Sequence, residues 1–167
     1  MGPGFGGQGE DVKHVRYFWY VTKHRWFVFV ACWQLGIPWL GLIHDWSKFT
    51  REEWGPYAEY FYGKNGRSNR SVSKDRHPGD RDPAFDEAWR QHYTRNKHHP
   101  QFWLSGVDPD GGVPTPMPEK YVREMVADWT GAGRAIQGRK DWRPWYLYNR
   151  DRLNLHPDTK ALVESWL

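Results

Sequence analysis

The chain has 167 residues, a length that suits one domain with a single buried core. Its single cysteine, Cys32, excludes an internal disulfide, so nothing requires an oxidising compartment and we expect a cytoplasmic protein. The formal net charge of +4 comes from residues 64–81, where six Lys or Arg accompany two Asp, and the rest of the chain is neutral. Because the surplus of positive charge is local, the composition does not indicate a nucleic-acid-binding surface that extends over the whole protein.

A membrane span is not expected, although residues 26–43 form a run of eighteen residues without a charged side chain. Gly36 and Pro38 divide that run into pieces shorter than the roughly 20 residues that a spanning helix needs. A secretory signal is not expected either, because basic residues run into the apolar part and no small-residue cleavage site follows it.

The first predicted element is a long helix. Residues 1–10 hold five glycines and are expected to form a flexible tail. From Asp11 to Gln34 apolar residues recur at helical spacing and predict a buried helix with His24 near its middle. The residues expected on its buried face are Val12, Val15, Trp19, Trp26, Val30 and Trp33.

A second helix is predicted over about residues 39–49. It places His44, Asp45 and Lys48 within little more than one turn, so that an imidazole, a carboxylate and an ammonium can face one cavity. The sequence Thr-Arg-Glu-Glu at residues 50–53 then has the spacing of a capping box, which predicts the start of a third helix.

Residues 64–81 are predicted to be a basic loop, interpreted either as a functional lid that attracts phosphate or as a solvated insertion. Asp82–Pro83 has the pattern of a helix start, and this helix is expected to run to about residue 99. Four residues of this helix form one stripe: Trp89, His92, Asn96 and His99. His98 lies about 100° to the side of that stripe. The pattern favours His99 over His98.

The C-terminal part is predicted to be helical after a loop rich in Gly and Pro over residues 100–118. The next helix puts Asp128, one turn after Glu124, on a mainly apolar face, where a carboxylate needs a cation. Two last helices are expected to start near Asp141 and Pro157.

The prediction is therefore an all-α fold, a single domain over residues 11–167 with about six to seven helices. Imidazole and carboxylate side chains recur on separate helices: His24, His44, Asp45, His92, His98 or His99, and Asp128. Mixed nitrogen and oxygen ligands suit Mn, Fe, Co, Ni or Zn, whereas an all-oxygen set would indicate Ca or Mg. We expect one or two divalent transition-metal ions, the second held by the remaining histidines if Asp45 bridges.

The chain resembles the HD-domain superfamily, a group of helical metal-dependent phosphohydrolases with the signature H…HD…D. The residues that match this signature are His24, His44, Asp45 and Asp128. The longer H…HD…H…H…D order of the two-metal members is matched by adding His92 and His98 or His99. His44-Asp45-x-x-Lys48 resembles the form found in cyclic-dinucleotide phosphodiesterases of the group, and residues 12–165 are similar to uncharacterised HD-like proteins of phages and bacteria.

This resemblance implies a compact HD-domain-like bundle that hydrolyses a nucleotide-like phosphoester by metal-activated water. The metal ligands implied are His24, His44, Asp45, Asp128, His92, His99 and His98. The residues implied in catalysis are Lys48, Asp45 and Glu124. The residues expected to contact the substrate are Arg134, Lys48, Trp46, Trp129 and Asn96, the tryptophans either by stacking a base or by packing the core. Many nucleotidases of the group have Glu where Lys48 stands, which leaves Glu124 or Glu53 as the candidate acid or base.

Two other classes of function remain open. Helical di-iron oxygenases share the same H…HD…H…H…D order, and bound iron with an oxygen-dependent spectrum would favour them. A non-catalytic protein could instead bind a nucleotide or a single strand through tryptophans and the 64–81 loop, and steep salt dependence without metal would point to that class.

Overall fold

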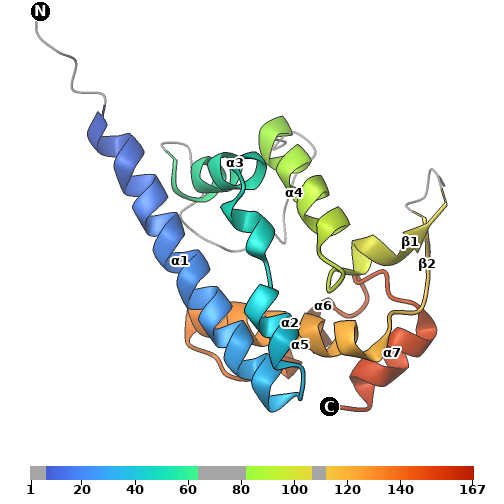
Figure 1. Ribbon diagram of the computed structural model, residues 1–167. Coiled ribbons are helices and arrows are strands. Elements are labelled where there is room, and N and C mark those ends of the chain that lie inside the picture. The colour runs from blue at the N-terminus through green and yellow to red at the C-terminus, as the bar shows by residue number, and fades with distance from the viewer. Residues whose placement is uncertain (1–6, 64–81, 107–111) are drawn as a thin grey trace, which may run out of the picture. The chain divides into compact units, whose positions relative to one another are not determined.

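The structure, a computed structural model, is all-α and describes residues 7–63, 82–106 and 112–167 (Figure 1). This confirms the predicted fold class. The described residues form seven α-helices: α1 (Gly7–Gln34), α2 (Pro38–Ile43), α3 (Arg51–Tyr62), α4 (Pro83–Arg95), α5 (Glu119–Gln137), α6 (Arg143–Asn149) and α7 (Pro157–Glu164). They also form two short 3-10 helices and two short strands: η1 (Trp46–Phe49), η2 (Pro100–Trp103), β1 (Leu104–Ser105) and β2 (Val113–Pro114).

The chain divides into two compact units, and α1 contributes to both. Unit 1 comprises residues 1–23 and 46–92, and unit 2 comprises residues 24–45 and 93–167. The single domain expected over residues 11–167 stays a prediction. The predicted loop at 64–81 lies outside the described residues, as does the tail up to residue 6, whereas residues 7–10 belong to α1.

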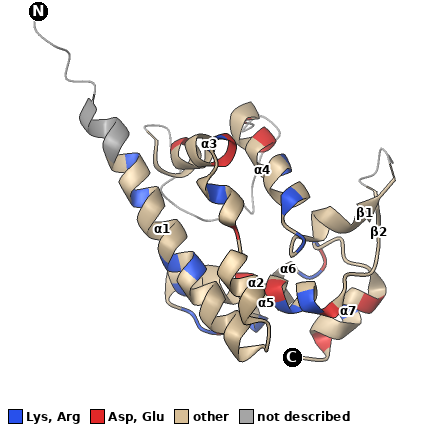
Figure 2. Cartoon of the chain, in the orientation of Figure 1, with Lys and Arg blue, Asp and Glu red and all other residues tan. Residues whose placement is uncertain are grey.

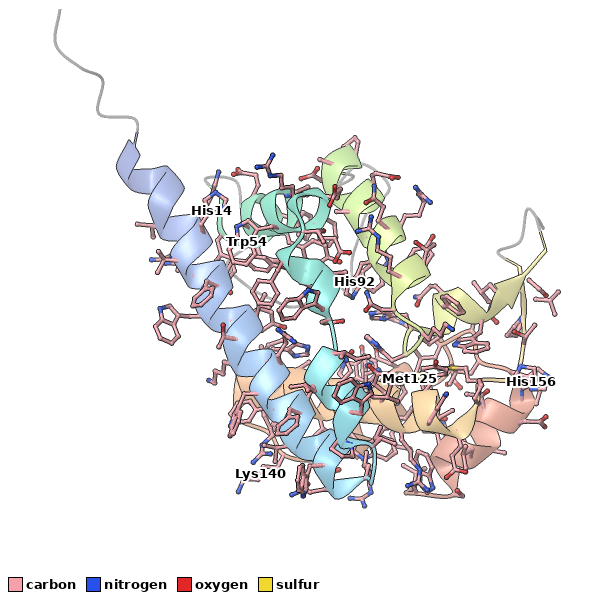
Figure 3. All side chains as sticks on the ribbon, viewed as in Figure 1. His14, Trp54, His92, Met125, Lys140 and His156 are labelled. Carbon is pink, nitrogen blue, oxygen red and sulfur yellow. The ribbon has the colours of Figure 1, made fainter. Side chains whose placement is uncertain are left out.

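Unit 1 has an aromatic core built on α1, α3 and α4. Its buried members are Tyr17, Val21, Tyr57, Ala58, Phe85 and Ala88. Further rings pack around this core; Tyr60, for example, stacks on Phe85 with 3.8 Å between ring centroids. At one side of the unit the Trp54 indole N–H donates to Nδ1 of His14 at 2.9 Å, and the two rings stack (Figure 3). Large rings of this kind bury much apolar area for each residue.

Unit 2 has two buried clusters. One joins α5, α6 and α7 and includes Met117, Val122, Met125, Val126, Tyr146 and Val163. Of these residues, Met125 is labelled in Figure 3. The other joins the C-terminal part of α1 to α5 through Val28, Ala31, Cys32 and Ala127. A Cβ atom at Gly131 would lie 2.9 Å from the backbone nitrogen of Val28, so glycine is what lets α5 approach α1 here.

The predicted buried face of α1 is wrong. Trp19, Trp26 and Trp33 are 66%, 60% and 65% exposed, and Val12 and Val15 are exposed as well. The buried residues lie on the opposite side of the helix: Tyr17, Val21, His24, Val28 and Cys32. Because α1 has apolar residues all around its circumference, their spacing identifies the helix but not its buried side.

The charged residues of α1 are all basic from residue 12 to residue 34, as Figure 2 shows for its described part. Among the described residues, no helix is long and apolar enough to cross a membrane.

Local signals at helix starts are mostly confirmed. Asp82 Oδ1 accepts hydrogen bonds from the backbone N–H groups of Ala84 and Phe85 at the start of α4. The third helix starts where expected, but the predicted capping box does not form, because Thr50 makes no side-chain cap hydrogen bond. Glu53 instead accepts a hydrogen bond from Ser47.

Two predicted helix ends are wrong, and both lie next to candidate ligands. α2 ends at Ile43, so His44 and Asp45 are in a turn before η1. α4 ends at Arg95, so Asn96, His98 and His99 lie beyond the helix and form no stripe with His92. The predicted loop over 100–118 contains η2 and an antiparallel ladder that pairs Leu104 with Pro114.

Candidate metal centre

The turn after α2, which is part of unit 2, carries two buried side chains, His44 and Asp45. Asp45 has φ of 52° and is the only non-glycine residue with a positive φ in the described part of the chain. Aspartate tolerates this left-handed conformation better than most residues, and its use here turns the chain sharply after His44. Arg25 fixes the turn, since its guanidinium donates to the carbonyl oxygens of His44 at 2.8 Å and Leu42 at 2.9 Å.

Helices α1 and α5 supply the facing side chains. His24 lies on the buried side of α1, four residues before Val28. Asp128 lies on α5 almost one turn before Gly131, where the backbone of α5 packs tightly against α1. His24 Nε2 is therefore only 3.1 Å from Asp128 Oδ1.

Four of the predicted ligands come together in unit 2. His24, His44, Asp45 and Asp128 each offer one ligand atom, and these atoms lie within 4.8 Å of one another. The Nε2 atoms of His24 and His44 lie 3.5 Å and 3.4 Å from Asp45 Oδ2. Two imidazole nitrogens and two carboxylate oxygens at these separations can hold a divalent transition-metal ion.

A second set of donors shares Asp45. His98 Nε2 lies 3.4 Å from Asp45 Oδ1, the oxygen that does not face His24 and His44. His99 also offers a ligand atom within 4.8 Å of Asp45 and His98. His98 is buried and His99 is half-buried, so both histidines reach the centre, whereas the stripe pattern favoured His99 alone.

Glu124 lies behind two of the imidazoles. Its Oε1 atom is 3.0 Å from Nδ1 of His44 and 3.3 Å from Nδ1 of His98. The sequence singled out Glu124 as a candidate acid or base and did not predict these two contacts. The available signal was its position one turn before Asp128 on the same helix.

The pKa values of two imidazoles in this centre are shifted in opposite directions. Burial disfavours a charged His44, but the negative charge of Asp45 and the contacts with Asp128 and Glu124 outweigh burial and raise the pKa of His44 to about 10. Burial, together with the charge on His44, lowers the pKa of His98. In the absence of a metal ion, His44 therefore holds a proton and His98 is neutral near pH 7.

The carboxylates are held in their charged form. Burial opposes ionisation of Asp128, yet its contacts with His24 and His44 keep its pKa well below the usual range. The pKa of Glu124 is also lowered, because hydrogen bonds from His44 and His98 overcome the effect of burial. Asp45 adds a third carboxylate to this set, and a group of three carboxylates suits a divalent cation.

Asp128 marks the accessible side of this centre. Its side chain is 18% exposed, against 3% for Asp45 and 7% for Glu124. Asp128 is therefore the most accessible of these three carboxylates.

Unit 1 contains the predicted site residues His92, Lys48 and Trp46. His92 is buried and its Nδ1 atom donates to Glu53 Oε2 at 2.8 Å. Lys48 Nζ lies 3.3 Å from Nε2 of His92 and 4.7 Å from the centre of the Tyr57 ring. The roles predicted for His92 as a ligand and Lys48 in catalysis stay predictions.

The remaining predicted residues have varied surroundings. Trp46 is exposed and contacts Phe49, and Asn96 is half-buried in the turn after α4. Trp129 packs in an aromatic group with Trp142, Trp145 and Tyr146. The guanidinium of Arg134 lies over the Phe27 ring at 4.9 Å. The substrate contacts predicted for these residues stay predictions.

Comparison with curated proteins and with solved structures finds no match. Residues 13–167 match a protein-family model described as a family of unknown function, DUF5662. Because the match covers nearly the whole chain, the protein belongs to the DUF5662 family.

Proposed function

We propose that the chain is a metal-dependent phosphohydrolase that acts on a nucleotide or a related phosphoester. The observation that supports this most strongly is the position of Asp45. One of its oxygens faces His24 and His44, and the other faces His98. A carboxylate with imidazoles on both sides is suited to bridge two metal ions.

In this proposal the first ion is held by His24, His44, Asp45 and Asp128, and the second by Asp45, His98 and His99. The mixture of imidazole and carboxylate donors favours Mn, Fe, Co, Ni or Zn over Ca or Mg. When bound, such ions activate a water molecule for attack on phosphorus and hold the phosphoryl oxygens. The order of the ligands along the chain, which resembles that of HD-domain phosphohydrolases, is what favours phosphoester hydrolysis over other metal chemistry.

The remaining assignments rest on the sequence alone. Lys48 and Arg134 would neutralise charge that develops in the transition state, and Trp46 or Trp129 would stack a base. His92 would complete the second set of ligands, and Asn96 would contact the substrate.

The first experiment is metal analysis followed by hydrolysis assays. We expect one or two equivalents of metal per chain, and phosphate release from a panel of nucleotides and chromogenic phosphoesters with Mn²⁺ or Co²⁺ under nitrogen. Metal-loaded protein that releases no phosphate under nitrogen but consumes oxygen when loaded with iron would replace the hydrolase by an oxygenase. Binding of single strands with steep salt dependence and no bound metal would replace it by a binding protein.

A variant of the central histidine tests the assignment of ligands. His44→Ala is expected to lose at least one bound ion and to reduce hydrolysis to background, because it removes a donor that faces both Asp45 and Asp128. His14→Ala is the matched control, since it removes an imidazole bonded to Trp54 in unit 1. Full metal content and full turnover in His44→Ala would remove His44 from the centre.

A further inference from the structure

Glu124 has an unusual position relative to the metal centre, because one of its oxygens contacts two imidazoles at once. Glu124 Oε1 lies 3.0 Å from Nδ1 of His44 and 3.3 Å from Nδ1 of His98. The two rings are neighbours, with centroids 4.3 Å apart and planes inclined by 39°. The Glu124 side chain is buried, so water does not compete strongly for its oxygens.

The opposite edges of the same two rings face Asp45. His44 Nε2 lies 3.4 Å from Asp45 Oδ2, and His98 Nε2 lies 3.4 Å from Asp45 Oδ1. Each ring is therefore placed between Glu124 on its Nδ1 side and Asp45 on its Nε2 side. His44 of the first set of donors and His98 of the second set therefore contact the same two carboxylates.

This arrangement determines which nitrogen of each ring can bind a cation. A neutral imidazole carries one N–H and one lone pair. If Nδ1–H donates to Glu124, the lone pair is on Nε2 and points towards Asp45, where the ion would lie. A carboxylate that receives the second N–H of a ligating histidine fixes the tautomer and the ring orientation and strengthens the ligand.

We propose that Glu124 is a positioning residue that orients His44 and His98 together, so that both metal positions depend on one carboxylate. This inference rests on the metal centre of the proposed function but not on the hydrolytic reaction. It assigns Glu124 a role different from that of a general acid or base, since both of its contacts are with ring nitrogens on the side away from Asp45.

The test measures metal binding rather than turnover. Purified apoprotein is titrated with Co²⁺, the visible spectrum is recorded, and bound metal is counted after gel filtration. Glu124→Ala is expected to weaken binding at both positions by about 10- to 100-fold, the range seen when an acceptor behind a ligating histidine is lost. Glu124→Gln keeps an oxygen that accepts N–H but removes the charge, so it should fall between Glu124→Ala and the wild type.

Glu119→Gln is the matched control. Glu119 is an exposed glutamate at the start of the same helix, paired with Arg123, and its loss should leave the number of ions, the affinity and the spectrum unchanged. The melting temperature of each apoprotein separates weaker metal binding from general destabilisation. If Glu124→Ala does not fold, Glu124→Gln decides the question.

Three results would overturn the inference in distinguishable ways. Wild-type affinity and spectrum in folded Glu124 variants would remove the positioning role and leave the proposed function intact. Loss of a single ion with the other unaffected would show that Glu124 orients one histidine and not both. Absence of Co²⁺ binding by the wild-type protein would overturn the metal centre itself, and the inference with it.

Discussion

A metal ion bound by His44, as proposed, would have to displace a proton from its imidazole. Because its pKa is raised to about 10, the imidazole is charged in the metal-free protein throughout the neutral range. A charged imidazole has no lone pair to donate, so binding of a cation at Nε2 requires loss of that proton. The same proton links stability to pH: its contribution to the free energy of unfolding is complete below about pH 6.5 and is lost as pH rises through about 10.

We therefore predict that metal affinity rises with pH. Between pH 6.5 and 8.5 the apparent dissociation constant for Co²⁺ should fall about tenfold per pH unit, because one proton is released for each ion bound next to His44. Calorimetry in two buffers with different heats of ionisation measures that proton directly. An affinity that does not change over this range would show that the ion does not displace the proton of His44.

The conformation of Asp45 shows what the sequence could not reveal at this scale. The residues themselves predicted a group of His24, His44, Asp45 and Asp128, and the structure places these four side chains together. The left-handed backbone at Asp45 was not predicted, because an apolar run followed by His-Asp continues the pattern of a helix. The hydrogen bonds that Arg25 donates to the carbonyl oxygens of His44 and Leu42 are tertiary contacts, and such contacts leave no local signal in the sequence.

At the scale of elements, α1 shows the limit of periodicity. The helix and its end at Gln34 were predictable, because no proline interrupts it and Gly36 with Pro38 follows. Its buried side was not, because tryptophan and valine at seven-residue spacing look like a core face even where they are exposed. The buried side instead carries smaller residues and tyrosine, such as Val28 and Tyr17, which fit against closely packed helices.

Paired substitutions on α1 test which side is buried. Trp26→Ala removes a large but exposed ring and is expected to change the free energy of unfolding by no more than about 0.5 kcal/mol. Val28→Ala removes a small but fully buried side chain that contacts α5 and should cost about 2 kcal/mol. Urea unfolding followed by circular dichroism measures both values. A larger loss for Trp26→Ala than for Val28→Ala would restore the face predicted from the sequence.

The candidate ligands after α4 illustrate a related limit. The start of α4 was predictable because Asp82 and Pro83 act within their own turn. Its end was not, and the error moved His98 and His99 from a helix face into a turn. In that turn both side chains reach Asp45, which a regular helix would not allow for neighbouring residues about 100° apart.

At the scale of the whole molecule, the centre joins segments that are distant in the sequence. Within unit 2 its side chains come from α1, the turn after α2, the turn before η2, and α5. Each proposed ion would be held by ligands from at least two of these segments, so it would bind the folded state and have little affinity for the unfolded chain. Metal binding would therefore also stabilise the fold.

This coupling predicts a metal-dependent melting temperature. At a free metal concentration about 100 times the dissociation constant, binding should add about 2.7 kcal/mol to the free energy of unfolding. For a chain of this length that corresponds to a rise of roughly 5 to 11 °C in Tm, measured by calorimetry with Mn²⁺, Co²⁺ or Zn²⁺ and reversed by a chelator. Asp128→Asn should reduce the rise, because it removes a charged donor at the accessible side of the centre. If Tm rises by the same amount in Asp128→Asn, the ion binds elsewhere. The stabilisation by a cation bound to carboxylates on the protein surface would not depend on Asp128.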